Sequence, residues 1–331
     1  MSNPFRALRV TEHPGDIFTR EVVTRQLEDL APGEVLIEVQ YSSLNYKDAL
    51  SATGNKGVTR QYPHTPGIDA SGLVAASTHP GLELGDAVLV TGYDLGMNTD
   101  GGYSEYVRVP AAWVVRVPED LDLYESMALG TAGFTAGLAL YKLEQAGQRP
   151  DMGPIVVTGA SGGVGCLAVG LLAKAGYEVI ASTGKETAHA FLHQMGAARC
   201  EDRSFVQDFS DRPLIRTRWA GAVDTVGGLT LATLLKACGR DGSVAACGLV
   251  HSPLLDTTVY PFILNGVNLL GVDSATCPQD VRQEVWNRLA TTWRLPAPDT
   301  YARTCTLDTL EPEIQAILRG EITGRVVVSL L

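Results

Sequence analysis

The chain has 331 residues, of which 45% are hydrophobic and 19% charged, and its formal net charge is −11. This length is enough for about two domains, each with its own core, and the composition is that of a folded globular protein. The densest basic cluster, residues 212–218, holds only three arginines, so nucleic acid is not an expected partner. The six cysteines form no C-x-x-C pair, which argues against a disulfide framework or a thiolate zinc site.

The N-terminal residues lack the apolar region of a signal peptide, and no window of the chain approaches the ~20 apolar residues of a membrane span. No transmembrane segment is therefore expected. The prediction for localisation is cytoplasmic.

The first 120 residues contain short strand-like segments separated by Gly and Pro. Strands are expected at 34–43, 69–77, 85–94, 101–110 and 113–118. This pattern predicts a small, mostly β domain over residues 1–123.

Between residues 124 and 271, apolar strands alternate with helical periods. Strands are expected at 154–160, 177–182, 221–227, 242–248 and 268–274, and helices at 163–176, 186–197 and 229–238. Such alternation predicts an α/β domain with a doubly wound parallel sheet. Beyond it, the pattern predicts helices at 280–293 and 310–321 and a last strand at 324–331.

The segment 155–176, IVVTGASGGVGCLAVGLLAKAG, has an apolar strand, a glycine-rich turn and then a helix. Ala160, Gly162 and Gly165 occupy the three positions of the G-x-G-x-x-G frame of dinucleotide-binding proteins. Small residues let the backbone approach a pyrophosphate, and the helix N-terminus offers it free N–H groups. The turn therefore predicts a dinucleotide cofactor, held by Ser161, Gly162, Gly163 and Val164.

The end of the second strand distinguishes the two nicotinamide cofactors, because a carboxylate there would favour a free ribose 2′-hydroxyl. This chain has Ser182, Thr183 and Lys185 instead, two hydroxyls and one cation that suit a 2′-phosphate. The prediction is NADPH. The alternative is a polar surface turn, and Glu186 would weaken phosphate binding.

A domain of this kind often accompanies a zinc site, so the metal ligands have to be considered. Residues 1–165 contain no cysteine, and the histidines among them are His13, His64 and His79, so no Cys-based catalytic zinc site is expected there. His189 and His193 are four residues apart on an expected helix and could share a metal ion, although a half-exposed helix face explains them as well. No metal is predicted.

Ten short motifs, in order along nearly the whole chain, resemble the zinc-free medium-chain dehydrogenase/reductases, and among them the YhdH-type acrylyl-CoA reductases also described as quinone oxidoreductases. They are SSLNYKDAL, PGIDASG, GGYSEY, GTAGFTA, VTGASGGVG, DTVGG, VAACGL, TTVYPFIL, GVDS and GRVVV. GTAGFTA and the pair PFIL and GVDS are the most specific. One position departs from the pattern: Asn265 follows PFIL, where the family often has a basic residue.

The resemblance implies a GroES-like catalytic domain at 1–123, a Rossmann NADPH-binding domain at 124–271, and a return to the catalytic domain at 272–331. It adds Gly248, Leu249, Asp273, Ser274 and Arg325 to the cofactor-binding residues. The implied activity is metal-free reduction of the C=C bond of a short enoyl thioester, acrylyl-CoA to propanoyl-CoA, in a homodimer. Reduction of quinones or small enones is the enzymatic alternative, and cofactor binding without turnover is the non-enzymatic one. Asn265 makes contact with acyl-CoA phosphates less certain.

Within the stretch SLNYKD (residues 43–48), Asn45–Asp48, NYKD, is the expected catalytic site. In conjugate reduction, negative charge develops on the thioester oxygen, and fixed hydrogen-bond donors have to hold it. Asn45 is the first candidate donor and Tyr46 the second. Tyr46 and Asp69 are candidates for the proton source, Asp69 only if burial raises its pKa.

Each of these residues also has a structural alternative. Asn45 could cap a helix, Asp69 could cap a turn, and Lys47 and Asp48 could pair with each other at the surface. Arg325 precedes the last strand and could simply be solvated.

Overall fold

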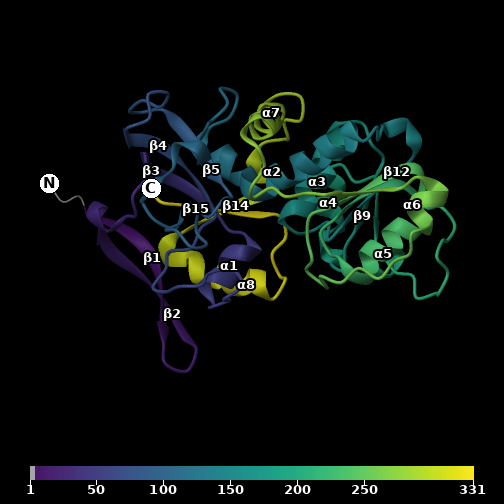
Figure 1. The fold of residues 1–331 in the computed structure, drawn as a ribbon, viewed down its shortest axis with the longest axis horizontal. Helices are drawn as coiled ribbons and strands as arrows, with labels where there is room; N and C mark the ends of the chain where they lie inside the picture. Colours follow the sequence, from purple (N-terminus) through teal and green to yellow (C-terminus); the bar gives the residue numbers. More distant parts are fainter. Residues whose placement is uncertain (1–3) are drawn as a thin grey trace. The chain divides into compact units, whose positions relative to one another are not determined.

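The computed structural model describes residues 4–331, which form two compact units (Figure 1). The first unit comprises the residues up to Thr131, Ala275–Ala290 and Ala297–Leu331, and the second comprises Ala132–Ser274 and Thr291–Pro296. The divisions at Thr131 and Ser274 lie eight and three residues after the boundaries expected at 123 and 271.

The first unit is mostly β, as expected. Its sheet has seven strands in the order β14-β15-β3-β4-β5-β7, with β6 also paired to β3. The strands are β3 (Val35–Ser43), β4 (Asp69–Ser77), β5 (Ala87–Thr91), β6 (Tyr106–Val109), β7 (Val115–Arg116), β14 (Ala302–Thr306) and β15 (Arg325–Ser329). Because β15 pairs with both β14 and β3, the end of the chain completes a sheet begun near its start.

Two further strands, β1 (Pro4–His13) and β2 (Ile17–Gln26), form an antiparallel ribbon that the sequence pattern did not predict. Most of β2 is partly or fully exposed, so its alternation of apolar and charged residues is weak. The helices are α1 (Tyr46–Ala52), α7 (Gln279–Ala290), α8 (Leu310–Leu318) and the start of α2 (Leu123–Gln145). Leu310 and Ile314 of α8 are buried in one core with Ala49 and Ala52 of α1.

The second unit is the expected doubly wound domain. Its six parallel strands have the order β10-β9-β8-β11-β12-β13, which is the 3-2-1-4-5-6 order of dinucleotide-binding folds. They are β8 (Ile155–Thr158), β9 (Val179–Ser182), β10 (Arg199–Glu201), β11 (Trp219–Asp224), β12 (Cys238–Ala246) and β13 (Asn268–Gly271). The helices are the later part of α2, α3 (Gly163–Lys174), α4 (His189–Gln194), α5 (Gly228–Lys236) and α6 (Tyr260–Asn265).

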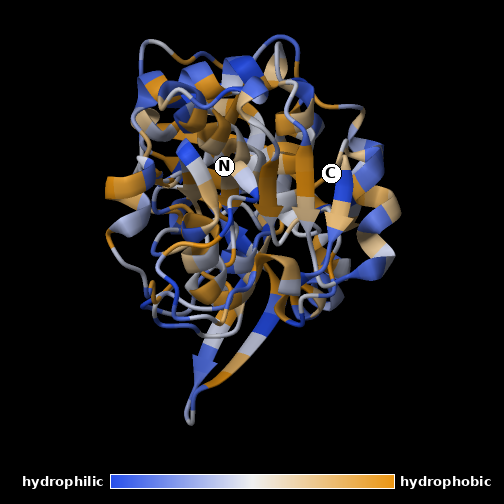
Figure 2. Cartoon of the chain, turned by 90° about the vertical axis from the view of Figure 1, so that its right-hand side faces the viewer, coloured by the Kyte–Doolittle hydropathy of each residue, from blue (hydrophilic) through white to orange (hydrophobic). Residues whose placement is uncertain are grey.

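The central strands of this sheet are buried along their whole length, because helices cover both faces. Figure 2 shows the hydrophobic colouring of strands at the centre and the more polar colouring of outer loops. The strand pattern therefore reads as continuous apolar runs, which is why these elements were predictable from the sequence. No helix within residues 4–331 is long and apolar enough to cross a membrane.

Candidate active site and cofactor site

The glycine-rich turn connects β8 to α3 in the second unit, as predicted. Gly159 has φ +58°, and a Cβ added at Gly165 would lie 2.3 Å from the Gly159 carbonyl oxygen. The helix can approach the strand this closely only because residue 165 has no side chain. Helix α3 begins at Gly163, with Gly162 at its N-cap, and the first-turn N–H groups of a helix have no acceptor within it. The turn therefore fits a pyrophosphate.

Two other predicted segments end at the same edge of the parallel sheet. Gly248 and Leu249 follow β12, and Asp273 and Ser274 follow β13. Gly248 packs tightly, since an added Cβ would lie 2.4 Å from the Thr225 carbonyl oxygen. Ligands of doubly wound sheets bind outside the carboxyl ends of the strands, so these positions fit a role in cofactor binding.

The residues predicted to bind the 2′-phosphate lie at the end of β9, but their hydroxyls face inward. Thr183 and Ser161 are buried and their hydroxyl oxygens are 2.9 Å apart. Ser182 is also buried, and its hydroxyl donates to the Asp202 carbonyl at 3.5 Å. Both hydroxyls are therefore hydrogen-bonded within the protein. Binding of a 2′-phosphate at the end of β9 would depend on positively charged side chains.

A second cation, which sequence reasoning missed, lies beside Lys185. Arg203 begins the 3₁₀ helix Arg203–Val206 after β10, and its side chain lies across Gly184. A Cβ added at Gly184 would lie 2.4 Å from Arg203 Nε, so the guanidinium lies directly against the backbone before Lys185. In the sequence, the only indication of this arrangement was Gly184, directly before Lys185. Lys185 and Arg203 together could bind a 2′-phosphate.

In the first unit, two of the three predicted catalytic residues, Asn45 and Asp69, belong to one buried cluster with Asp48 and Arg325. Asn45 directs its Nδ2 to Asp69 Oδ2 at 2.8 Å and to Asp48 Oδ2 at 3.2 Å, and its Oδ1 accepts from Arg325 Nη1 at 3.3 Å. Asn45 is also the N-cap of α1, and its backbone N–H donates to Asp48 Oδ2 at 2.8 Å. The N-cap interpretation of Asn45 is thus confirmed, and its amide hydrogens point into the cluster; its catalytic role stays a prediction.

Asp69 is fully buried and surrounded by donors. Ser43 Oγ donates to it at 2.5 Å, and Thr131 donates through its backbone N–H at 2.9 Å and its hydroxyl at 2.5 Å, in addition to Asn45. Thr131 follows Gly130, the kink in α2, so Asp69 caps the second part of that helix. All four contacts use the Asp69 carboxyl group as an acceptor. This geometry disfavours Asp69 as the proton source.

Arg325 is 3% exposed, so the alternative that it is a solvated arginine is wrong. Its guanidinium donates to Ser43 Oγ at 2.9 Å and to the carbonyl oxygens of Leu44 and Ala128, both at 3.2 Å. Strand β15 places it there because it pairs antiparallel with the end of β3. The contribution of Ser43 and Thr131 was missed, because a single Ser or Thr carries no sequence signal.

The expectation that Asp48 pairs with Lys47 at the surface is wrong, since Asp48 is fully buried. Its Oδ1 accepts from the backbone N–H of Ile68 at 2.8 Å, while its Oδ2 binds Asn45. Burial, and next the neighbouring Asp69 carboxylate, raise the pKa of Asp48 to about 7. Asp48 is thus a buried acid of α1 that contacts the residue before β4, although the sequence suggested a surface ion pair.

The stability of the protein should therefore depend on the ionisation of Asp48. Folded Asp48 keeps its proton up to about pH 7, whereas the ordinary value is 3.8, so its contribution is full at low pH and is lost as the pH rises to 7. Between pH 4.5 and 6.5 the unfolding free energy of the protein, minus that of Asp48→Asn, should fall by about 1.4 kcal/mol per pH unit. Urea titrations of both proteins measure it. A difference that stays constant with pH would contradict the assignment.

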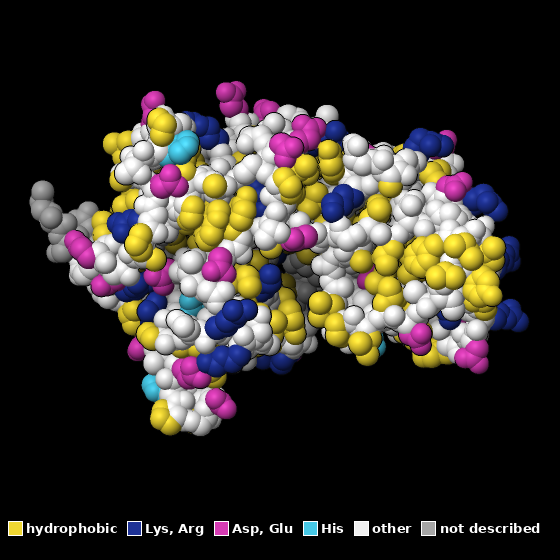
Figure 3. Space-filling model, viewed as in Figure 1, with side chains coloured by type: hydrophobic (Ala, Val, Ile, Leu, Met, Phe, Trp, Pro, Cys, Tyr) yellow, Lys and Arg dark blue, Asp and Glu magenta, His cyan; other side chains and the backbone are white. Residues whose placement is uncertain are grey.

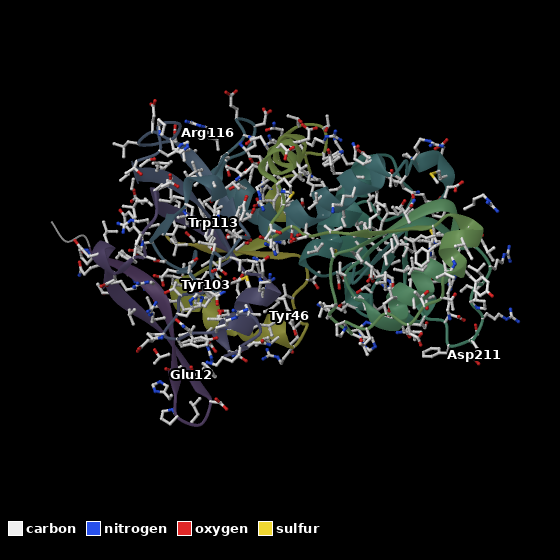
Figure 4. All side chains as sticks on the ribbon, viewed as in Figure 1. Glu12, Tyr46, Tyr103, Trp113, Arg116 and Asp211 are labelled. Atoms are coloured by element: carbon white, nitrogen blue, oxygen red, sulfur yellow. The ribbon has the colours of Figure 1, made fainter. Side chains whose placement is uncertain are left out.

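Tyr46, labelled in Figure 4, begins α1 and is 44% exposed, whereas Asn45 and Asp48 are buried. Within residues 4–331 its hydroxyl has no hydrogen-bond partner, so it is available to a ligand. The structure thus separates the two predicted donors: Asn45 belongs to the buried cluster, and Tyr46 lies at the surface in front of it.

Within the described part of the chain, no group of three or more His, Cys, Asp or Glu side chains is arranged to hold a metal ion. His193 Nδ1 contacts the Ala197 carbonyl oxygen at 2.9 Å. Metal-free catalysis remains a prediction.

A β-rich unit with a buried Asn–Asp–Arg cluster and a doubly wound unit with a glycine-rich turn define a two-domain dinucleotide-dependent oxidoreductase. Residues 31–119 match the alcohol dehydrogenase GroES-like domain, and residues 163–291 match the zinc-binding dehydrogenase family. The fold class predicted from the sequence is confirmed.

Individual relatives narrow this class. The chain is 43% identical to the acrylyl-CoA reductase AcuI of Ruegeria pomeroyi, over 98% of both chains. It is 45% identical to YhfP of Bacillus subtilis, which carries a quinone oxidoreductase name, over the whole of both chains. A structure of that protein with NAD bound has a TM-score of 0.95 at 44% identity, covering 99% of both chains. The yhdH oxidoreductase of Salmonella enterica, in complex with NADP, has a TM-score of 0.94 at 43% identity, covering 98% of this chain and 99% of that one.

The chain therefore belongs to the acrylyl-CoA reductase and YhdH-type quinone oxidoreductase branch of the medium-chain dehydrogenase/reductases. The predicted family is confirmed.

Proposed function

We propose that the protein reduces the C=C bond of a short enoyl thioester with NADPH, converting acrylyl-CoA to propanoyl-CoA without a metal. The observation that carries the proposal is the buried cluster of Asn45, Asp48, Asp69 and Arg325, with the exposed Tyr46 next to Asn45 at the start of α1. The identity to an acrylyl-CoA reductase over nearly the whole chain supports the substrate class.

The cofactor site fits a phosphorylated dinucleotide, with the turn before α3 for the pyrophosphate and Lys185 and Arg203 for the 2′-phosphate. When bound, NADPH supplies the hydride that the β-carbon of the thioester accepts. Direct contact with the cofactor remains a proposal for every predicted residue. These are the residues of the turn before α3, those after β12 and β13, those at the end of β9, and Arg325.

Tyr46 is the proposed donor to the thioester oxygen, because its hydroxyl is the accessible one. As negative charge develops on that oxygen, a phenol can hydrogen-bond to it without a change of its own charge. Tyr46 is also the candidate proton source for the α-carbon; the phenolate left by that transfer would take a proton back from water, since the side chain is exposed. Asn45, Asp69 and Arg325 hold the start of α1 and so orient Tyr46. The proposal therefore assigns the contact with the thioester oxygen to Tyr46, where the sequence favoured Asn45, and it does not use Asp69 as the proton source.

A substrate panel tests the proposal. Oxidation of NADPH, followed at 340 nm, should be fastest with acrylyl-CoA, slower with crotonyl-CoA and slowest with a benzoquinone. The quinone alternative rests on the name of the B. subtilis relative, and a benzoquinone preferred over both thioesters would establish it instead. Cofactor binding with no turnover of any of the three would favour the non-enzymatic alternative.

Cofactor preference gives a sharper prediction, because relatives at similar identity hold NADP in one structure and NAD in another. A charge-assisted contact to a phosphate contributes about 1.5–3 kcal/mol, so Lys185→Glu and Arg203→Glu should each lower kcat/KM for NADPH relative to NADH by roughly tenfold to a hundredfold. Lys174→Glu is the control, because it makes the same change of charge in the last turn of α3, at the opposite end from the glycine-rich turn. It should leave the ratio of kcat/KM for NADPH to that for NADH unchanged. Equal efficiency of the unmodified protein with NADH and NADPH would refute the prediction.

We propose that the expected homodimer forms at the β13 edge of the second unit. Strand β13 has β12 as its only neighbour among the described strands. Eight exposed large hydrophobic residues lie between residues 250 and 269, and Figure 3 shows hydrophobic side chains gathered near α6. This edge patch consists of Val250, Leu254, Leu255, Val259, Tyr260, Ile263, Leu264 and Leu269. A second copy would pair with the open edge of β13 and cover the patch.

A charge in the edge patch should therefore separate the subunits. Ile263 is 68% exposed, so Ile263→Glu should leave the monomer folded and shift sedimentation at micromolar concentration from dimer to monomer. Phe209→Glu is the matched control, because Phe209 is equally apolar and exposed but lies outside the patch. A dimer that persists in Ile263→Glu, or a monomeric unmodified protein, would contradict the proposal.

A further inference from the structure

Arg282 is a fully buried arginine outside the cluster already described. It lies on α7 and is 0% exposed. Its Nη1 donates to the backbone oxygen of Thr91 at 2.8 Å and to the Thr91 hydroxyl at 3.0 Å, and its Nη2 donates to the Ala275 carbonyl at 3.2 Å. Burying a guanidinium is costly, so these contacts call for an explanation.

Thr91 is the last residue of β5 and lies directly opposite Asp69 in the β4–β5 pair. Directly opposed residues of an antiparallel pair place their side chains on the same face of the sheet. The next backbone contact, from Gly92 N–H to the Ile68 carbonyl at 3.0 Å, continues the pairing beside Asp69. Arg282 therefore holds the strand end that supports Asp69.

The residue after Gly92 is strained and also contacts Arg282. Tyr93 has φ +52°, a conformation that a non-glycine residue keeps only when its surroundings hold it. Arg282 Cζ lies 4.5 Å from the centre of the Tyr93 ring, and that ring stacks on Trp113 with 5.4 Å between ring centres. Tyr93 N–H also donates to Ala275 oxygen at 2.9 Å, the carbonyl that Arg282 binds.

The segment that starts here, residues 92–103, returns to the cluster. Gly102 N–H donates to the Gly67 carbonyl at 2.8 Å, and there is no room for a side chain at 102, since an added Cβ would lie 1.9 Å from the Asp69 carbonyl oxygen. The segment ends at Tyr103, whose buried hydroxyl donates to the Ser43 carbonyl at 3.3 Å. Both ends of the segment thus contact residues that hold the cluster.

We propose that Arg282 is a positioning residue for the catalytic cluster: it acts through Thr91 and Tyr93 to fix Asp69 and the 92–103 segment. A planar guanidinium can donate to two atoms of Thr91 and one of Ala275 while it covers the Tyr93 ring. A lysine has neither the second donor group nor the flat face. The inference rests on the proposed function, because Asp69 matters to it only if the cluster is catalytic.

Three variants test the inference. Arg282→Lys keeps the charge and loses the geometry, Thr91→Val removes the hydroxyl that Arg282 binds, and Leu289→Ala is a destabilising core control on the same helix. Arg282→Lys should lower kcat with acrylyl-CoA by about tenfold or more and leave KM within about twofold, because misplaced catalytic groups act mainly on turnover. Thr91→Val should reproduce part of this loss. Leu289→Ala should lower Tm and leave kcat at 25 °C unchanged.

Hydrogen exchange, read by mass spectrometry, provides a second measurement that does not need activity. Amides of residues 92–103 should exchange about tenfold faster in Arg282→Lys than in the unmodified protein, and at an unchanged rate in Leu289→Ala. If Arg282→Lys does not fold, Thr91→Val decides: unchanged kcat and unchanged exchange of residues 92–103 in that variant overturn the inference. The inference is also overturned if Leu289→Ala shows the same changes in kcat and in exchange as Arg282→Lys. If the unmodified protein reduces no thioester or quinone, the proposed function fails, and the exchange of 92–103 alone decides whether Arg282 fixes this segment.

Discussion

Replacing Gly130 by alanine is expected to destabilise the protein severely. Gly130 has φ +53° and ψ −155°, a conformation almost restricted to glycine. An added Cβ would also lie 2.6 Å from Asp69 Oδ2 and from Ser43 Oγ, and 3.1 Å from Arg325 Nη2. Backbone strain and overpacking together should cost about 2–6 kcal/mol, a large part of the stability of an ordinary domain.

The control for this prediction is Gly147→Ala. Gly147 has a similar positive φ, +84°, but nothing lies within 4 Å of an added Cβ. This variant should lose only the backbone term, about 1–2 kcal/mol. Thermal and urea unfolding of both proteins measure the difference. Equal stability of the two variants would show that the cluster tolerates a methyl group at residue 130 and is less closely packed than the distances indicate.

The second large effect is expected on turnover. Tyr46→Phe removes the exposed hydroxyl proposed to hold the thioester oxygen and should lower kcat with acrylyl-CoA by about 10²-fold. Because the hydroxyl has no partner among residues 4–331, Tm and NADPH affinity should not change. Steady-state kinetics, with Tm measured on the same samples, check both parts. A kcat within twofold of the unmodified protein would remove Tyr46 from the mechanism.

Asn45→Ala is the informative partner of that variant, because Asn45 is both the N-cap of α1 and a donor to two buried carboxylates. It should lower kcat at least tenfold, by releasing Tyr46, and should also lower stability by about 1–3 kcal/mol, because Asp48 and Asp69 lose a donor. Loss of stability with full turnover would leave Asn45 as a cap only. Loss of turnover at unchanged stability would instead return Asn45 to direct contact with the thioester oxygen.

The amino-acid sequence by itself determined the two-domain architecture and the kind of cofactor site. Strands such as β3, β4 and β8 were predictable because burial of one or both faces imposes a local apolar pattern. The turn before α3 was predictable because pyrophosphate binding needs several small residues within a few positions. The ribbon of β1 and β2 was missed, since it is largely exposed and its pattern is weak.

The tertiary structure alone decided how the polar residues of the candidate site are used. Asp48 looked like half of a surface ion pair and is a buried acid, and Arg325 could have been solvated and is bound to Ser43 and Asn45. Arg203 lies against Gly184 only because β10 pairs with β9, with Glu201 opposite Ser182. Burial and hydrogen bonds between residues up to 282 positions apart depend on strand pairing, here of β15 with β3. The pattern of neighbours along the chain carries no record of such contacts, and so their chemistry could not be predicted from it.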